Sequence, residues 1–207
     1  FAGYNTQADG KGIVVKYDTT SLTAENGAIV DVYATWTANQ YKVIFDGNAP
    51  AGVSTVGNIP TTITATYDKD ISADELGEAT ATGYTFQSWN TKADGTGDEV
   101  LATSRNLTTG TEVTIYAQWT ANKYAVTLYT YVKVGDGEAK ESAVGGTVTG
   151  AESIDFNATA TIRAIALAGY HFVGWYTGKG VSTKFAATAT ATTDKMTTSG
   201  LVYTALF

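Results

Sequence analysis

The chain has 207 residues, a formal net charge of −7 and no cysteine. A negative charge of this size argues against nucleic acid and anionic membrane surfaces as partners, because both would repel the chain. The composition also removes disulfides and thiol chemistry, and no apolar run approaches the roughly 20 residues needed to cross a bilayer, so we expect no direct membrane insertion.

Long repeats organise the sequence. Residues 1–12 (FAGYNTQADGKG) match residues 86–97 (FQSWNTKADGTG) at Phe, Asn, Thr, Ala, Asp and two glycines. Residues 32–43 (VYATWTANQYKV) recur 83 positions later as IYAQWTANKYAV, and GYTFQSW at residues 83–89 recurs 86 positions later as GYHFVGW. A fixed period of this kind indicates an array of similar structural units.

The period divides the chain into three units. We place the back part of a repeat at residues 1–38, a complete repeat at residues 39–121 and a third repeat at residues 122–207. Because Phe1 falls inside a repeat, we expect the chain to be a piece or a processed product of a longer protein. Units of about 85 residues bury only a small core, so we expect aromatic side chains to supply most of it.

The first unit predicts two strands, at residues 12–17 (GIVVKY) and 30–36. Apolar and polar residues alternate along the second, as they do along the matching strand one unit later. These two alternating strands end at Trp36 and Trp119. We predict that each tryptophan fills the core of its unit near the junction with the next.

Only four residues join successive units, at 37–40 (TANQ) and 120–123 (TANK). Neither joint contains glycine or proline, and a new alternating strand begins almost at once at Tyr41. A linker this short and this poor in glycine leaves little freedom between its neighbours. We therefore predict closely packed units arranged as a semi-rigid rod.

The central unit predicts one more strand and a short helix. Residues 61–67 (TTITATY) form a β-branched run that favours a strand. Ser72 and Glu75 have the spacing of a capping box, which predicts a helix at residues 73–79 with Leu76 as its core anchor.

Three aromatic residues follow Gly83 with an unusual spacing. In a flat strand Tyr84 and Phe86 would share one face and Trp89 would point to the other. Either the strand bends near Ser88 or Trp89 covers the second face. The spacing recurs in the third unit, so the same geometry is expected there.

The third unit diverges from the other two. Residues 124–134 and 159–167 predict strands, and the Ala/Thr-rich residues 185–198 predict a loop or a weak edge strand. Residues 203–207 close this unit where Trp119 closes the previous one.

The ordered pattern Y-x-V-x-F-D-G-N, G-Y-x-F-x-x-W-N-T and I-Y-A-Q-W resembles the Listeria–Bacteroides repeat, also called the internalin B-repeat, of bacterial surface proteins. The third unit, with GYHFVGW and a closing TALF, is similar to the divergent members of that family. The resemblance implies a mainly β fold of tandem small β-grasp-like modules, each a mixed sheet with at most one short helix. It also implies display in series on an extracellular stalk without enzymatic activity.

No motif in the sequence predicts catalysis, a metal or a cofactor. His171 lacks a cysteine or a second histidine as a partner, so we expect a surface-facing strand residue. The acidic loop at residues 94–99 lacks EF-hand spacing and does not recur, which favours a solvated turn over a calcium site. For the same reason we expect the acidic residues within 68–75 to be a solvated surface. Asn106 and Asn157 begin N-x-T sequons that a threonine-rich chain produces by chance.

Four tyrosines form the one candidate interaction surface. Tyr33, Tyr116, Tyr129 and Tyr131 alternate onto the outer faces of their strands. A row of exposed tyrosines could stack on sugars or dock a partner protein. Alternatively, the same residues seal the interface between neighbouring units.

We therefore expect a non-catalytic stalk module of a secreted, cell-surface or cell-wall-attached bacterial protein, with an adhesive role left open. One alternative is a module that binds a host surface protein or glycan. Another is the subunit of a self-assembling extracellular filament, whose partners are copies of itself. Residues 1–40 lack the strand that begins the other units, so we expect an unpaired sheet edge there. These residues should be either poorly ordered or completed by a neighbouring molecule or an upstream segment.

Overall fold

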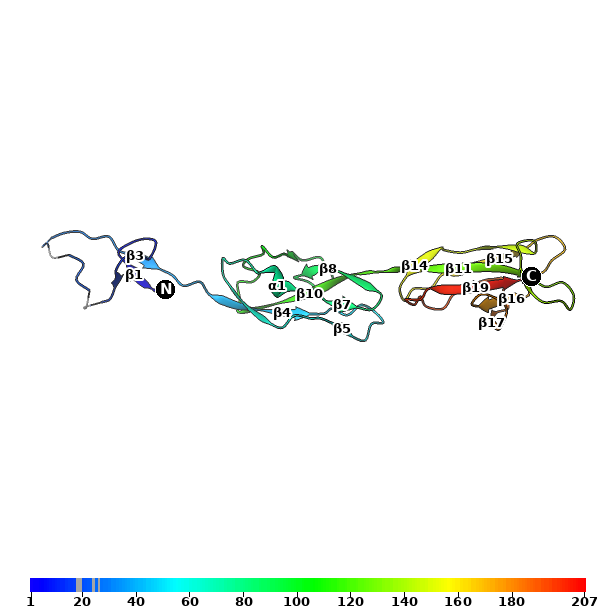
Figure 1. Cartoon of the computed structure of the whole chain (residues 1–207). Coiled ribbons are helices and arrows are strands. Elements are labelled where there is room, and N and C mark those ends of the chain that lie inside the picture. The colour runs from blue at the N-terminus through cyan, green and yellow to red at the C-terminus, as the bar shows by residue number, and fades with distance from the viewer. Residues whose placement is uncertain (18–19, 24, 26) are drawn as a thin grey trace.

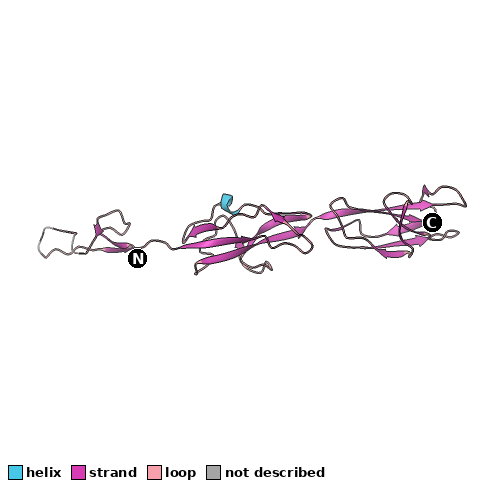
Figure 2. Cartoon of the chain, turned by 90° about the horizontal axis from the view of Figure 1, so that it is seen from below, coloured by secondary structure: helices cyan, strands magenta, loops and turns pink. Residues whose placement is uncertain are grey.

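The structure, a computed structural model, describes residues 1–17, 20–23, 25 and 27–207. Strands make up nearly all of its regular structure, with a single short helix in the described residues, so the expectation of a mainly β fold is confirmed. The three units follow one another along the chain in Figure 1, with the C-terminus at the end of the third. Figure 2 shows that the longest strands run along this same direction.

The first unit holds a small antiparallel sheet in the order β2-β1-β3. Its strands are β1 (Gly3–Asn5), β2 (Val14–Val15) and β3 (Tyr33–Thr35). Both strands predicted in this unit are present, but each is shorter than its sequence pattern. Asn5 holds the β1–β2 turn, because its amide donates to the carbonyl oxygens of Gly10 and Gly12 at 3.0 and 3.3 Å.

The prediction that Trp36 fills a core is wrong. Its side chain is 74% exposed and contacts the ring of Phe1 edge-on, at 5.6 Å between centroids. Among the described strands, β3 pairs with β1 alone. One face of a three-stranded sheet is too small to enclose an indole, so the tryptophan stays at the surface.

The central unit is built on a seven-stranded mixed sheet in the order β5-β7-β8-β10-β4-β6, with β9 paired to β8. Its strands are β4 (Gln40–Asp46), β5 (Val56–Gly57), β6 (Ile63–Thr66), β7 (Thr80–Ala81), β8 (Tyr84–Asn90), β9 (Glu99–Val100) and β10 (Glu112–Ala121). The two long strands β4 and β10 pair in parallel, and the remaining pairs are antiparallel.

Alternation produces the central core as predicted. On β4, Tyr41, Val43 and Phe45 are buried while the residues between them face outward. On β10, Ile115 is fully buried, whereas Trp119 packs only partly against the same core and donates its indole N–H to the Gly47 carbonyl oxygen at 3.0 Å. Trp119 therefore covers the rim of the core.

Trp89 lies at the centre of this core. Its side chain is 2% exposed, and its indole N–H donates to the carbonyl oxygens of Leu76 and Gly77 at 2.9 and 3.2 Å. The ring contacts Phe45 edge-on at 5.0 Å and Phe86 at 5.3 Å. A buried indole needs an acceptor, and the segment at the end of the helix supplies two.

The helix α1 (Ala73–Leu76) is shorter than its sequence pattern but has the predicted capping box. Ser72 accepts from the Glu75 backbone N–H, and the Glu75 carboxylate accepts from the Ser72 backbone N–H. The helix ends at Gly77, which has a left-handed φ of 50°. Its buried Leu76 anchors the helix to the core, as predicted.

A β-bulge explains the aromatic spacing of β8. Ser88 pairs with Gln118 and Phe86 pairs with the next residue of β10, Trp119, so Gln87 is an extra residue without a partner on β10. The bulge changes the phase of the strand, which brings Phe86 and Trp89 to the same side. The first of the two sequence alternatives, a bend near Ser88, is confirmed.

The third unit has a six-stranded mixed sheet in the order β12-β11-β19-β16-β17, with β14 paired to β11, and a separate sheet β13-β15-β18. Its strands are β11 (Lys123–Val132), β12 (Lys140–Glu141), β13 (Gly146–Thr149), β14 (Ser153–Asp155), β15 (Thr161–Ala166), β16 (Gly174–Thr177), β17 (Thr183–Ala186), β18 (Thr190–Thr192) and β19 (Leu201–Leu206). Its pairing repeats the central unit, because β11 lies parallel to β19 as β4 does to β10, and β16 lies antiparallel to β19 as β8 does to β10.

The core of the third unit is centred on Trp175, which is fully buried beside Phe172 and Tyr203. Phe207 closes this core as predicted. The Ala/Thr-rich residues 185–198 hold the end of the edge strand β17 and the edge strand β18, with loops around them, so both parts of the prediction, a loop and a weak edge strand, are present. The prediction that His171 lies in a strand is wrong, because β16 begins only at Gly174.

Candidate functional site

The joint between the central and third units is a nearly unbroken strand. A single residue, Asn122, separates β10 from β11. Its backbone N–H donates to the Gly83 carbonyl oxygen at 2.9 Å, and its carbonyl oxygen accepts from the Phe156 N–H at 2.8 Å. Its side-chain oxygen accepts from the Thr85 hydroxyl. Asn122 thus bonds to both units at once.

An aromatic contact closes the same joint. The Phe156 ring lies against the backbone of Gly83, where an added Cβ would come within 2.2 Å of the ring. Gly83 also has a left-handed φ of 80°, so a glycine is required there for space and for conformation. The Phe156 ring is edge-on to Tyr84 at 5.8 Å and to Tyr124 at 6.2 Å.

Asn157 makes the second contact between the two units. Its side-chain amide donates to the Ala51 carbonyl oxygen at 3.1 Å and lies where a side chain at Gly52 would stand. We call Ala51, Gly52, Gly83 and Tyr84 the seat, and Phe156 with Asn157 the plug. Two separate loops of the central unit therefore receive one turn of the third.

The first joint repeats part of this arrangement. The Tyr67 backbone N–H donates to the Asn39 carbonyl oxygen at 2.9 Å, just as Phe156 donates to Asn122. The Tyr67 ring lies edge-on to Tyr41 of its own unit at 6.2 Å, the same separation as in the equivalent pair of the third unit. Tyr67 therefore occupies the plug position of the central unit.

Sequence reasoning located the joint but missed both the seat and the plug. The repeated Gly-Tyr pair at Gly83 was a usable signal, because a glycine before an aromatic strand marks a constrained turn. Phe156 gave none, since it lies far from Gly83 in the sequence, in a turn after a short strand with no distinctive pattern.

The structure places the four predicted tyrosines on three strands. Tyr33 on β3 is 42% exposed, whereas Tyr116 on β10 and the pair Tyr129 and Tyr131 on β11 are half-buried. Only the last two are close together, separated by a single residue on one strand. The aromatic rings in contact at the joint belong to other residues, Tyr84, Tyr124 and Phe156.

A lysine covers part of the tyrosine face on β11. The ammonium of Lys179 lies 4.6 Å from the centre of the Tyr129 ring and 2.8 Å from a Glu141 carboxylate oxygen. The hydrogen bond to Glu141 raises the pKa of Lys179, with smaller contributions from Tyr129 and Tyr131. The lysine thus occupies the ring face that a sugar would need for stacking.

The polar residues singled out in the sequence serve as local structure. The Asp94 carboxylate accepts from the Thr96 backbone N–H and hydroxyl, and these bonds hold the pKa of Asp94 below its usual value. His171 is exposed, as expected, although outside a strand. No group of three or more potential metal ligands occurs in the described part of the chain.

Both sequon asparagines use their side chains within the fold. The Asn106 amide donates to the Asp68 carboxylate at 2.7 Å, and its oxygen accepts from the Asp68 backbone N–H at 2.7 Å. Asn157 is part of the plug. Nearby, Arg105 is paired with Asp70, and this contact lowers the pKa of Asp70.

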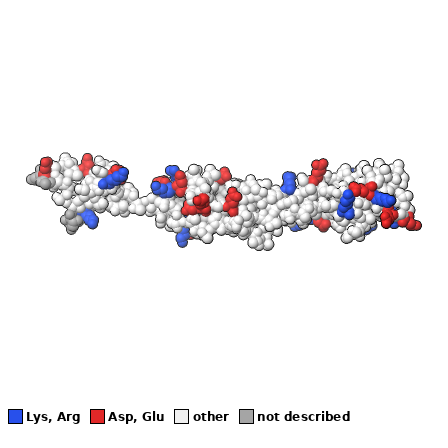
Figure 3. All heavy atoms as spheres, in the orientation of Figure 1, with Lys and Arg blue, Asp and Glu red and all other residues white. Residues whose placement is uncertain are grey.

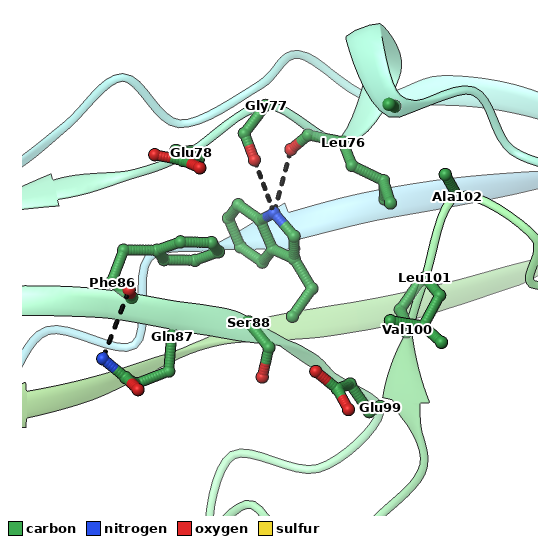
Figure 4. A pocket seen from close by; sticks show the side chains of 12 residues that line it. Leu76, Gly77, Glu78, Phe86, Gln87, Ser88, Glu99, Val100, Leu101 and Ala102 are labelled. Atoms are coloured by element: carbon green, nitrogen blue, oxygen red, sulfur yellow. Dashed lines mark hydrogen bonds between the residues drawn. The ribbon is translucent and has the colours of Figure 1, made fainter.

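A shallow hollow of about 300 Å³ lies beside the helix of the central unit (Figure 4). Leu76, Phe86 and Val100 line its apolar side, and Glu78 and Glu99 lie at its margin. The indole of Trp89 also lines the hollow but is buried and hydrogen-bonded to the chain, so its ring face is not free to stack on a ligand.

The surface carries no continuous basic stretch on the face shown in Figure 3, where the described lysines and arginines are scattered among acidic side chains. Within the residues described, no helix has the length and hydropathy needed to span a membrane. The buried side-chain polar atoms described all have hydrogen-bond partners, so no unsatisfied group marks a ligand site.

Repeated mixed sheets, joined by two strands that a single residue separates and by an aromatic contact, define a tandem β-repeat protein. The chain belongs to the Listeria–Bacteroides repeat family: residues 41–118 match the Listeria-Bacteroides repeat domain, and residues 139–207 match the divergent InlB B-repeat domain. This family is typical of bacterial surface proteins, and its repeats are structural modules.

Two proteins of Evansella cellulosilytica are similar to the chain. One, provisionally named a Gly-rich membrane protein, is 33% identical over 181 residues, covering 85% of this chain and 19% of the relative. The other, provisionally named a membrane protein, is 33% identical over 103 residues, covering 50% of this chain and 14% of the relative. The chain thus spans less than a fifth of each relative. No solved structure matches it significantly.

Proposed function

We propose that the chain is a non-catalytic stalk segment of a bacterial cell-surface protein, in which small β-grasp-like units at residues 1–38, 39–121 and 122–207 stack as a semi-rigid rod. The joint at Asn122 is the observation that carries the proposal. Strand continuity, three hydrogen bonds and the plug in its seat act against bending in different directions. A spacer requires this resistance to bending, and it requires no reactive group.

An extracellular position at the cell surface or wall is part of this proposal. The family is typical of surface proteins, and the two relatives carry membrane-protein names. A host surface protein or glycan remains a candidate partner at Tyr33, Tyr116, Tyr129 and Tyr131. The lysine over Tyr129 and the separation of the four residues favour the spacer role.

Small-angle scattering of the full chain tests the stalk. We expect an elongated particle whose central and third units show a narrow range of relative angles. The variant Phe156→Ala removes the plug ring and should broaden that range, whereas Tyr17→Ala, which removes an exposed ring in the first unit, should leave it unchanged. Unrestricted bending in the wild type, or saturable binding of the chain to a glycan or host-protein panel, would contradict the spacer assignment.

A second candidate, the subunit of a filament, rests on the edge of β3 that no described strand occupies. In the central unit, the strand equivalent to β3 is β10, and its other edge pairs in parallel with β4. In the first unit, Val30 and Val32 are exposed, at the positions that Val113 and Ile115 occupy on β10. A strand from another molecule could pair there, because an unpaired edge is a template for strand addition.

A further inference from the structure

We propose that Gly169 and Tyr170 of the third unit form a second seat, which receives the plug of another repeat unit of this same kind. The inference rests on the proposed stalk function and extends it by naming a docking surface and its partner. Four observations lead to it.

The first observation is that the turn before Tyr170 has the same conformation as the occupied seat. Gly169 has a left-handed φ of 88°, against 80° at Gly83, and each glycine precedes a tyrosine in the repeated G-Y-x-F-x-x-W motif. In the occupied seat the glycine is buried under Phe156. Gly169, in contrast, is exposed, with no described atom within 4 Å of an added Cβ.

The second observation is a hollow beside this turn, lined by apolar and polar side chains together. Its volume is about 490 Å³, and Tyr170 forms one wall. Val134 and Val144 line it and are 74% and 59% exposed, which is unusual for two valines at the end of an ordered sheet. Glu138, Lys140, Glu141 and Ser142 add charged and polar groups to its lining. Such a surface fits an apolar ring bordered by a hydrogen-bonding group, which is the chemistry of the plug.

The third observation is the register of the closing strand. Ala205 of β19 pairs with Trp175, as Ala117 of β10 pairs with Trp89. Phe207 therefore holds the position of Trp119, two residues beyond the paired alanine. A strand continued from that point would reach Gly169 as the Asn122 joint reaches Gly83.

The fourth observation is that the plug is a feature of the repeat. Tyr67 in the central unit and Phe156 in the third have the same backbone hydrogen bond and the same edge-on contact with the first tyrosine of their units. An aromatic ring at this position is thus available in both complete repeats. The occupant of the second seat is accordingly an aromatic plug, and not an unrelated peptide or a sugar.

The test uses the full chain extended after Phe207 by a second copy of residues 120–207. Amide exchange is measured over residues 167–171 in the extended and the unextended chain. We expect exchange at Gly169 and Tyr170 to slow by roughly tenfold or more in the extended chain, as it does for backbone that becomes part of a packed unit. Phe156→Ala placed only in the added copy should restore fast exchange.

Two results would overturn the inference. One is an added copy that folds, with its own Trp175 region protected, while residues 167–171 exchange as fast as before. The other is an added copy that does not fold, because an end surface that receives a following unit should support one. Protection around Asn122 in the same samples reports on the existing joint. Loss of that protection contradicts the stalk itself, whereas its presence with an unprotected Gly169 contradicts only the second seat.

Discussion

Trp89 shows how much of a small unit depends on one side chain. It is 2% exposed, it contacts Phe45 and Phe86, and both of its hydrogen bonds go to carbonyl oxygens at the end of the helix. Trp89→Ala should lower the free energy of unfolding by about 3–5 kcal/mol, because it leaves a cavity and two unpaired acceptors. That is comparable to the whole stability of a small unit, so the central unit should unfold at room temperature.

Trp36 provides the matched control, because it occupies the strand end of the first unit and is 74% exposed. Trp36→Ala should change the free energy of unfolding of the central unit by less than about 0.5 kcal/mol. Urea denaturation followed by far-ultraviolet circular dichroism measures both variants. Equal midpoints for Trp89→Ala and Trp36→Ala would show that the core is not organised around Trp89.

Tyr203 should make the third unit less stable at alkaline pH. Burial raises the pKa of Tyr203 to about 12, and its hydroxyl donates to Asp194 at 3.0 Å. A folded-state pKa above the unfolded value of 10.0 means that the stabilising contribution is complete below about pH 10. It is lost as the pH rises from 10 to 12, because the unfolded chain releases this proton more easily.

Comparison with Tyr203→Phe isolates this titration from the other twelve tyrosines, since the chain has thirteen. The variant should be less stable at neutral pH by about 1–2 kcal/mol, as the loss of a buried hydrogen-bonded hydroxyl usually is. The difference in melting temperature between the two proteins should shrink between pH 10 and pH 12. A constant difference in melting temperature over that range would mean that the pKa of Tyr203 is not raised in the folded protein.

At the scale of the element, the bulge in β8 decides which residues enter the core. Gln87 is exposed and has no partner on β10, yet its presence is what brings Phe86 and Trp89 to one side. Deletion of Gln87 should shift the phase of the strand by one residue and expose one of the two rings. We expect loss of the cooperative unfolding transition of the central unit.

Gln87→Ala separates the backbone role from the side chain. It keeps the extra residue and removes only an exposed amide, so the unfolding midpoint should remain close to that of the wild type. Calorimetry of the two variants provides the comparison. A deletion variant as stable as Gln87→Ala would show that the bulge can be dispensed with.

The elements that sequence reasoning recovered are those whose information is local. Tyr41, Val43 and Phe45 alternate within one strand, and Ser72 and Glu75 meet across one helical turn, so their neighbours in sequence are also their neighbours in space. The sequence predicted the bulge only in part. The aromatic spacing shows that the alternation of β8 is interrupted, but the position of the extra residue depends on the partner strand.

The interpretations that failed depended on what lies across the sheet. Trp36 and Trp119 end similar sequences, but among the described strands only that of Trp119, β10, pairs with a parallel strand, β4, and the chain just after β4 covers part of Trp119. The plug was missed for the same reason. Phe156 contacts Gly83 and Tyr84 from a different unit, and no pattern within either segment encodes that contact.

Across the whole molecule, protection from amide exchange should increase from the first unit to the joint between the central and third units. β3 has one partner among the described strands, whereas β10 lies between β4 and β8 and is followed after one residue by β11. Protection of an amide from exchange reflects the free energy of the opening that exposes it. A strand with two partners and a packed face opens only when its whole unit unfolds, so β10 should be the most protected strand of the central unit.

Amide exchange on a dilute monomer measures this gradient. We expect β3 to exchange nearly as fast as an unfolded chain and β10 to exchange at least about a thousandfold more slowly, in line with several kcal/mol of unfolding free energy. A peptide with the sequence of residues 40–48 (QYKVIFDGN) should then slow exchange over residues 29–33, up to the start of β3, by pairing in the register that joins Val43 to Val113 in the central unit. The same peptide with Val43→Asp should have no effect, because an aspartate would enter the apolar face formed by Val30 and Val32. Slow exchange of β3 in the monomer without any peptide would show that the first sheet is stable alone, and the strand-pairing route to a filament would be abandoned.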